Sequence, residues 1–279
     1  MTKLVPRASL IISIYKNIPF LTTILDSLKL QTEQNFEVII SEDGDDKKVR
    51  EFIASYNFSQ PYRHISQPDN GWNKCEALNK AIRTSSTNWL IFIDGDCVLH
   101  PRFIEMHLRY AKPDRIVLGK RVKLNDELSK LLMSDVNNIP KIESSLINML
   151  LTGKKNGTRF VEEGIFVNPR GPLGFLPMLR RVTKRRLIGS NMSMSKKALL
   201  EINGFDEDYK APTTGEDKDI RWRLERLGYK PYSICMIAIQ YHLNHPESWN
   251  GDICRENEKI MFANMEKNLI YCKNGLNKI

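Results

Sequence analysis

Short apolar runs of strand length alternate with stretches of helical spacing over the first hundred residues of the chain. The apolar runs are Ser9–Ile14, Phe36–Ile40, Tyr62–Ile65 and Trp89–Ile93. The positions with helical spacing are Phe20, Leu21, Ile24, Leu25 and Leu28, then Val49, Phe52 and Ile53, and then Cys75, Ala77, Leu78, Ala81 and Ile82. An unbroken apolar run is typical of a strand buried on both faces of a parallel sheet, and its alternation with helices indicates an α/β fold. We therefore expect half of a doubly wound sheet, with ligands at the carboxyl ends of its strands.

The pattern weakens between Met106 and Ile188, where prolines and glycines recur. We expect a variable, loop-rich segment there, with one or two helices. Regularity returns at Gly189. We expect a helix over Lys196–Ile202 and a strand over Ser233–Gln240. Between them we expect a helix that begins at Thr213–Asp217, with threonines as caps. Its buried stripe would consist of Ile220, Leu224 and Leu227.

The composition is that of an ordinary globular chain. Of 279 residues, 41% are hydrophobic and 27% are charged, which excludes disordered, collagen-like and coiled-coil chains. A chain of this length buries roughly three quarters of its unfolded surface and needs no metal or disulfide to fold. Its five cysteines are scattered and form no CxxC pair, which argues against a zinc ribbon or a disulfide scaffold and for a reducing compartment. Because the chain shows no signal-peptide pattern and no apolar run of about 18 residues, we expect a cytoplasmic protein.

Positive charge is concentrated in the middle of the chain. The net charge is +9, and Arg180–Arg186 holds five positive charges in seven positions. Between Met106 and Ser190 there are 17 basic and 7 acidic residues. This segment is a solvated basic face, a patch that meets an anionic membrane surface, or a nucleic-acid site. The apolar residues over 172–182 favour the membrane, so we expect no nucleic-acid partner and a peripheral contact of 172–186 with the inner face of a membrane.

Three acidic residues follow apolar runs. Asp94 and Asp96 come directly after Trp89–Ile93, and Asp43 follows the second run. Two carboxylates at the mouth of a buried strand repel one another, and a hard divalent cation such as Mg²⁺ or Mn²⁺ offsets that cost. The carboxylate of Asp43 can accept a hydrogen bond from a nucleobase N–H. Taken alone, each of these positions is equally well explained as a polar turn in solvent.

Asp217 falls on the same expected helical face as the buried stripe that follows it. A carboxylate near a helix N-terminus stays charged, and partial burial makes it a stronger base. Asp217 therefore suits the role of a general base, and Glu216 beside it suits the binding of a sugar hydroxyl. The alternative is that both acids only cap the helix. His242 and His245 follow the expected late strand, and histidine is a common metal ligand, although such a pair is more often structural.

Four blocks of the chain occur in the order found in one known family. They read SLIISIYKN, FEVIISEDGD, WLIFIDGDCVLHP, and GSNMSMSKKALLEINGFDEDY followed by TTGEDKDIRWRLERLGY and YHLNHP. With them the chain resembles the inverting glycosyltransferases of family 2, whose GT-A fold is a Rossmann-like, mostly parallel sheet with an acceptor-side subregion. The last block resembles galactosyltransferase-type and chondroitin-polymerase-type enzymes. The implied organisation is a donor-binding half over 1–110, a variable basic segment over 111–186, and an acceptor and catalytic half of the same domain over 187–279.

The resemblance implies a donor site built on the first half. Tyr15 would stack on uracil, and Asp43 would accept a hydrogen bond from its N3–H. Lys74 would approach the donor, and Asp94 would meet the ribose or the sugar. Asp96 would bind Mn²⁺ or Mg²⁺.

The resemblance also implies a metal ligand and an acceptor site in the last third of the chain. His242 would complete the metal site, and His245 is the weaker candidate. Asp217 would be the catalytic base, and Glu216 would hold the acceptor. The pocket of the acceptor would be lined by Gly189, Ser190 and Asn191.

The implied reaction moves a hexose or an N-acetylhexosamine from a UDP-sugar to a glycan or a lipid-linked saccharide, in the synthesis of a surface polysaccharide. Two alternatives are a catalytically silent glycan-binding protein of the same fold and a sugar nucleotidyltransferase. The latter would carry a glycine-rich loop after the first strand, where this chain reads Ser13-Ile14-Tyr15-Lys16-Asn17.

Overall fold

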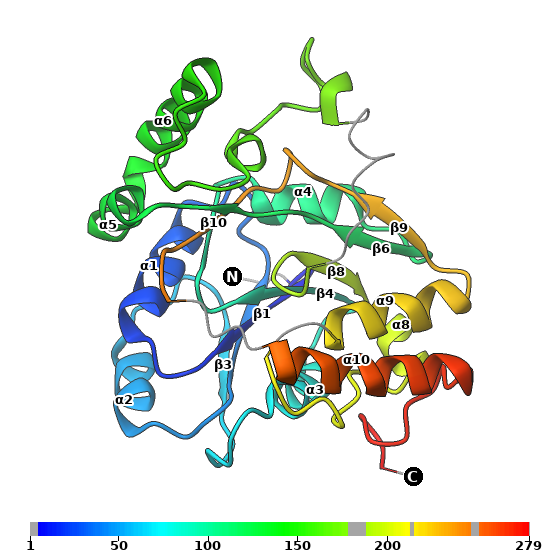
Figure 1. Ribbon diagram of the computed structural model, residues 1–279. Helices are drawn as coiled ribbons and strands as arrows, with labels where there is room; N and C mark the ends of the chain where they lie inside the picture. Colours follow the sequence, from blue (N-terminus) through cyan, green and yellow to red (C-terminus); the bar gives the residue numbers. More distant parts are fainter. Residues whose placement is uncertain (1–4, 178–187, 213–214, 247–250, 279) are drawn as a thin grey trace.

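A seven-stranded sheet runs through the centre of the molecule (Figure 1). The computed structural model describes residues 5–177, 188–212, 215–246 and 251–278. The strand order is β3-β2-β1-β4-β8-β6-β9, and each pairing is parallel except those of β8 with β4 and β6. The strands are β1 (Ser9–Ile14), β2 (Glu37–Glu42), β3 (Tyr62–Ile65), β4 (Trp89–Asp94), β6 (Arg115–Leu118), β8 (Met192–Ser195) and β9 (Lys230–Ser233).

A small second sheet lies beside the carboxyl end of β4. It consists of β5 (Cys97–Leu99), β10 (Gln240–His242) and β7 (Val122–Lys123), with β10 in the middle. β10 is antiparallel to β5 and parallel to β7, and its register sets His242 opposite Cys97. This pairing brings the end of β10 to the turn that follows β4.

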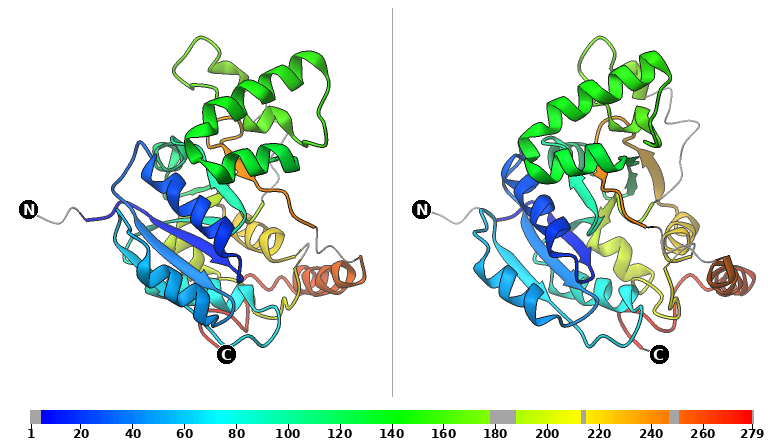
Figure 2. Two further views of the ribbon diagram at one scale, coloured as in Figure 1. Left: turned by 90° about the vertical axis from the view of Figure 1, so that its left-hand side faces the viewer. Right: turned by 60° about the vertical axis from the view of Figure 1, so that its left-hand side comes forward.

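Helices cover both faces of the central sheet (Figures 1 and 2). They are α1 (Ile18–Lys29), α2 (Lys47–Ser55), α3 (Lys74–Thr84), α4 (Phe103–Tyr110), α5 (Asp126–Ser134), α6 (Ile139–Thr152), α8 (Lys196–Glu201), α9 (Glu216–Arg226) and α10 (Gly251–Glu266), with 3₁₀ turns η1 (Val136–Asn138) and η2 (Val161–Gly164). Alternate strand residues point to opposite faces. Leu10 and Ile12 of β1 join the core under α1 and α2, whereas Ile11 joins the core under α3, α8 and α9.

The α/β fold expected from the sequence is confirmed. β1, β2, β3 and β4 coincide with the four apolar runs, and α1, α2 and α3 with the helical spacings between them. β1 and β4 are buried along nearly their whole length, as a sheet covered on both faces requires.

The strand expected over Ser233–Gln240 is wrong. The chain leaves the central sheet at the end of β9, turns, and enters the small sheet at β10. The turn is held by hydrogen bonds from the N–H groups of Ile237 and Ala238 to the carbonyl of Ile234, and Met236 has a φ of +60°. Ile234 and Ile237 are fully buried, so the apolar run marks a buried turn that no glycine or proline signals.

The segment 111–186 was expected to be loop-rich with one or two helices, and α5 and α6 match the helices. β6 and β7 were not expected there. β6 pairs with β8 and β9 in the central sheet, so this segment supplies part of the same sheet rather than only loops. Only four and two residues long, these strands are too short for a periodicity to show.

α9 begins at Glu216 after Gly215, which adopts a φ of +155° and makes no side-chain cap. The threonines expected as caps lie outside the described residues. Within the expected stripe, Ile220 and Leu224 are fully buried, but Leu227 follows the last helical turn and is exposed.

The basic run Arg180–Arg186 also lies outside the described residues, so the expected membrane patch over 172–186 stays a prediction. None of the helices that the structure describes is both long and apolar enough to cross a membrane.

Candidate active site

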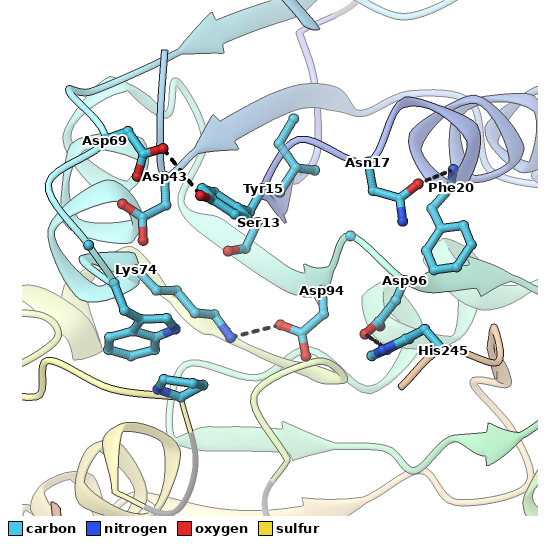
Figure 3. A pocket seen from close by; sticks show the side chains of 15 residues that line it. Ser13, Tyr15, Asn17, Phe20, Asp43, Asp69, Lys74, Asp94, Asp96 and His245 are labelled. Atoms are coloured by element: carbon cyan, nitrogen blue, oxygen red, sulfur yellow. Dashed lines mark hydrogen bonds and ion pairs between the residues drawn. The ribbon is translucent and has the colours of Figure 1, made fainter. Parts of the chain in front are cut away.

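A cleft of about 620 Å³ opens at the carboxyl ends of β1, β2 and β4, as the strand order predicts (Figure 3). A second hollow of about 310 Å³ adjoins it. The two share six lining residues, which makes them one continuous cleft. The shared residues are Trp72, Lys74, Asp94, Asp96, Pro212 and His245.

Tyr15, which directly follows β1, lines the cleft and is 55% exposed. Its hydroxyl donates to Asp69 over 3.2 Å, and the ammonium of Lys16 lies 2.6 Å from the same carboxylate. Gly44 packs beside the ring, because a Cβ added at this glycine would lie 3.7 Å from it. The ring is therefore positioned while most of it stays accessible to a ligand.

Asp43 lies in the floor of the same cleft and is almost fully buried. Its Oδ1 accepts a hydrogen bond from Gln67 Nε2 over 2.7 Å, and its Oδ2 accepts one from the backbone N–H of Asn73 over 2.7 Å. A carboxylate has about four lone-pair positions, so capacity for a ligand N–H remains. Asp43 also ties β2 to the loop that leads into α3.

Lys74 begins α3 and reaches across the cleft. Its Nζ lies 2.8 Å from Asp94 Oδ1 and 3.9 Å from Glu216 Oε1. Burial alone would lower the pKa of Lys74, but the two carboxylates outweigh it and raise that pKa. On the other side of Asp94, the guanidinium of Arg121 lies 3.3 Å from Oδ2. Asp94 is thus held between two cations.

Asp96 contacts two histidines, His242 at the end of β10 and His245 just after it. Nε2 of His242 lies 3.2 Å and Nε2 of His245 lies 3.1 Å from its Oδ2. Burial opposes ionisation of Asp96, but hydrogen bonds with the two histidines outweigh it and hold its pKa well below its usual range. The hydrogen bond with Asp96 raises the pKa of His245.

These three groups fit a divalent cation. Their ligand atoms all lie within 4.8 Å of one another, and they open on the cleft. One carboxylate oxygen and two imidazole nitrogens suit Mn²⁺ and other first-row divalent ions. His245 was expected to be the weaker candidate, yet the structure places both histidines equally near Asp96.

Glu216 and Asp217 begin α9 and face the second hollow. Burial raises the pKa of Glu216 to about 8, and its Oε2 is buried without a hydrogen-bond partner among the described residues. Burial also raises the pKa of Asp217. Its oxygens accept hydrogen bonds from the backbone N–H groups of Gly189, over 3.1 Å, and Lys218, over 2.7 Å. The two N–H donors, one of them in the first turn of α9, favour the charged form of this carboxylate, whereas burial makes it more basic.

Of the residues expected around the acceptor, Gly189 and Ser190 line the second hollow and Asn191 does not. Asn191 is fully buried; its Nδ2 donates to the carbonyls of Lys120 and Ala238, and its Oδ1 lies 3.0 Å from His107 Nε2. With its amide bonded on both sides, Asn191 ties β6 to β8 instead of meeting a ligand. The expectation of Asn191 as an acceptor-pocket residue is corrected accordingly.

Sequence reasoning missed two other residues of the cleft. Arg121 contacts Asp94 and lies 4.0 Å from Asp96, and Trp72 lines both hollows. Arg121 follows β6, the short strand that the pattern did not reveal. Trp72 lies just before α3, in a loop where an aromatic residue without apolar neighbours was the available signal.

The family of the chain follows from a comparison with family models. Residues 9–167, more than half of the chain, match the model of glycosyl transferase family 2. The chain therefore belongs to glycosyltransferase family 2, as the motifs indicated.

Several curated proteins are similar to this chain. The chondroitin synthase of Escherichia coli is 26% identical over 87% of the chain, and the hyaluronan synthase of Pasteurella multocida is 23% identical over 87%. The amylovoran biosynthesis glycosyltransferase AmsB of Erwinia amylovora is 24% identical over 84% of the chain and is itself covered over 69%. The chain spans 35% and 25% of the length of the two synthases.

Solved structures share the fold at low identity. A Pyrobaculum calidifontis mannosyltransferase in complex with GDP-Man and Mn²⁺ aligns with a TM-score of 0.57, at 14% identity, over 94% of this chain and 65% of that one. S. aureus TarS 1-349 in complex with UDP-GlcNAc aligns with a TM-score of 0.62, at 14% identity, over 92% of this chain and 66% of that one. The GT-A fold expected from the motifs is confirmed.

Proposed function

We propose that this chain is a metal-dependent, inverting glycosyltransferase that moves a hexose or N-acetylhexosamine from a UDP-sugar to a growing glycan or a lipid-linked saccharide. One observation carries the proposal. A three-group cation site, Asp96 with His242 and His245, and a buried, basic carboxylate, Asp217, face the same continuous cleft. A direct displacement needs these two chemistries on either side of one anomeric carbon.

Asp217 acts as the general base. Its raised pKa makes it a better proton acceptor, and its two N–H donors hold it at the wall of the second hollow. It removes the proton of an acceptor hydroxyl, and that oxygen forms a bond to the anomeric carbon as the bond to the diphosphate breaks on the opposite face. Configuration at that carbon inverts.

Glu216 positions the acceptor. Burial raises the pKa of its carboxyl to about 8, so the group holds a proton more readily and, when protonated, donates a hydrogen bond as well as accepting one. Its unpartnered Oε2 favours a ligand hydroxyl, because a buried polar atom without a partner costs free energy that a bound hydroxyl recovers.

Tyr15 and Asp43 bind the nucleoside. The exposed ring of Tyr15 offers a stacking surface, and Asp43 offers an acceptor for a base N–H. Lys74 and Arg121 hold Asp94 between them and supply positive charge next to the place of the diphosphate.

Asp96, His242 and His245 would hold a divalent cation, Mn²⁺ or Mg²⁺. When bound, it would neutralise negative charge on the leaving diphosphate. One structural neighbour is a complex with GDP-Man and Mn²⁺ and another is a complex with UDP-GlcNAc, which supports a divalent cation and a nucleotide-sugar donor.

A polysaccharide as product is supported by the similarity to chondroitin and hyaluronan synthases and to the amylovoran enzyme. A cytoplasmic site of action is part of the same proposal. Cys75, Cys97 and Cys272 are buried free thiols, in keeping with a reducing compartment.

A thermal-shift experiment with UDP, GDP and CMP, each with and without Mn²⁺, tests the donor class. A ligand at a hundredfold excess over its Kd stabilises by about 2.7 kcal/mol, which raises the Tm of a domain of this size by roughly 5 to 10 °C. We expect that rise with UDP and metal together. Release of UDP from UDP-sugars, followed by proton NMR of the new anomeric centre, then tests transfer and inversion. No Tm rise with any nucleotide would instead favour the glycan-binding alternative.

A further inference from the structure

Exposed apolar side chains gather at one end of the molecule. Among the described residues, 13 large hydrophobic side chains are exposed, and six of them fall between positions 147 and 175. They are Ile147, Leu150, Leu151, Phe160, Leu173 and Phe175. In all three ribbon views α6 and the segment 165–177 form the upper end of the molecule, away from the C-terminus (Figures 1 and 2). We call the six residues the apolar tip.

Basic side chains accompany the apolar tip. Lys154, Lys155 and Arg170 are exposed. The acidic residues of the segment 144–177 are Glu162, which is half-buried, and Glu163, which is buried. Two exposed acids, Asp126 and Glu127, lie close by at the start of α5, because Asn125 donates a hydrogen bond to the carbonyl of Asn156. Asp126 pairs with Lys130, so the exposed charges of the segment 144–177 itself are positive.

The backbone around Phe160 holds this member of the tip in an exposed position. Its φ of +57° and ψ of +43° place a bulky residue in the left-handed region, which costs free energy. Lys123 and Arg159 exchange both backbone hydrogen bonds just before it, and the fully buried Val161 follows it. The backbone on both sides thus fixes the position of a ring that is 52% exposed. Strain of this kind persists where the surroundings impose it, and it often accompanies function.

The apolar tip is joined to the acceptor side of the cleft. Lys123, whose backbone pairs with Arg159, lines the second hollow. Phe160 directly follows Arg159, so the backbone bridge between Lys123 and Arg159 connects the hollow to Phe160. A surface that bound the tip would lie beside the place where an acceptor enters.

We propose that the apolar tip docks on an anionic lipid bilayer, with Leu150, Leu151 and Phe160 in the headgroup boundary and Lys154 and Lys155 on the lipid phosphates. This inference concerns a surface apart from the catalytic groups and does not need the proposed reaction to hold. It places the contact mainly on α6 and the turn after it, rather than on 172–186 alone.

A bilayer fits this surface better than a protein partner. The six side chains come from a helix end and two turns, and none of them lines the hollows described above. Apolar residues flanked by lysines are typical of an interfacial membrane contact. A second copy of the chain carries the same positive charge at this end, which disfavours self-association through it.

Co-sedimentation of the full chain with vesicles tests the proposal. We expect binding to phosphatidylcholine vesicles containing 30% phosphatidylglycerol, weak binding to pure phosphatidylcholine, and loss of binding as salt rises. Leu151→Gln combined with Phe160→Asn should weaken binding at least tenfold, since Asn tolerates the left-handed backbone while removing the ring. Lys154→Ala combined with Lys155→Ala should remove the preference for the anionic lipid.

Phe262→Gln on α10 is the matched control, because Phe262 is equally exposed but lies outside the tip. It should bind vesicles as the unmodified chain does, and all variants should keep their Tm and their UDP-dependent Tm rise. The proposal is overturned if the unmodified chain does not bind anionic vesicles, or if Phe262→Gln loses as much binding as the tip variant. It is also overturned if ultracentrifugation shows a dimer that Leu151→Gln dissociates, because a second copy then covers the tip.

Discussion

The cleft contains two sets of carboxylates that the fold treats in opposite ways. Asp94 and Asp96 follow β4 and face Lys74, Arg121 and two histidines, and the pKa of Asp96 is held well below its usual range. Glu216 and Asp217 begin α9 and are buried, and the pKa of each is raised. The pKa of the same functional group is thus lowered at Asp96 and raised at Glu216 and Asp217, which suits the proposed roles in metal binding and in proton transfer.

Lys74 connects the two sets. It pairs closely with Asp94 and lies 3.9 Å from Glu216, so its charge acts on both. The difference between the sets therefore depends on partners and not on residue type. Four predictions, from the largest expected effect to the smallest, test that difference.

Asp217→Asn should have the largest effect. An amide cannot accept the proton of the acceptor hydroxyl, and loss of a general base typically costs 10² to 10⁴ in rate. We expect kcat to fall by about 10³ while the Kd for UDP and metal stays within a factor of about two. Asp208→Asn, at an exposed acid outside the cleft, is the control and should leave kcat unchanged. Unchanged turnover in Asp217→Asn would remove Asp217 from the mechanism.

Asp96→Ala should abolish the metal-dependent part of the Tm rise with UDP, and EDTA should do the same to the unmodified chain. His242→Ala and His245→Ala should each weaken metal affinity, by about 10-fold to 100-fold, because both rings lie equally near Asp96. Titration of Mn²⁺ against each variant measures this. Full metal affinity in His245→Ala would leave His242 as the only histidine ligand.

Lys74→Met should shift the pH profile of kcat/KM. Lys74 lowers the pKa of Glu216 and of Asp217, so its removal raises both. The acid limb of the profile reports the base and should move to higher pH. Lys80→Met is the control, because Lys80 lies on the same helix but contacts Glu76 and Gln67 and not the acids of the acceptor side; it should leave the limb in place. A limb that does not move would mean that Lys74 does not set the basicity of the acceptor side.

Glu216→Gln should have the smallest effect, on stability. The pKa of Glu216 is raised from 4.5 to about 8 on folding, so the folded state retains a proton that the unfolded state loses in that range. This group's contribution to stability is therefore full below pH 4.5 and declines as pH rises to about 8. The Gln variant lacks this titration. We compare the Tm of the Gln variant with that of the unmodified chain at each pH. The difference, variant minus unmodified chain, should be larger at pH 8 than at pH 5 by a few degrees. A difference that does not change with pH would show that Glu216 titrates normally.

Much of the site could be predicted because its donor side follows strands. Asp43 and Asp94 end apolar runs, and parallel strands bring their carboxyl ends to one edge. Asp217 could be located because it precedes a helical stripe. Arg121 could not, because β6 is too short to show a period, and Asn191 was assigned wrongly because its hydrogen-bond partners lie on other elements.

Tertiary structure alone decided which groups meet. His245 comes within 3.1 Å of an aspartate 149 positions away, and that contact depends on the turn that carries the chain from β9 to β10. The apolar run over this turn was expected to be a strand, since local pattern reports that residues are buried but not which way the backbone goes.

The sequence by itself determined the class of fold, the family and the acids at the strand ends, because apolar periodicity and motif order are local properties of the chain. The folded structure decided the pairing of both histidines with Asp96, the shared position of Lys74 between Asp94 and Glu216, and the exposure of Phe160. Each of these is a contact, or the lack of one, between segments far apart in sequence, so it depends on how the sheets and helices pack against one another.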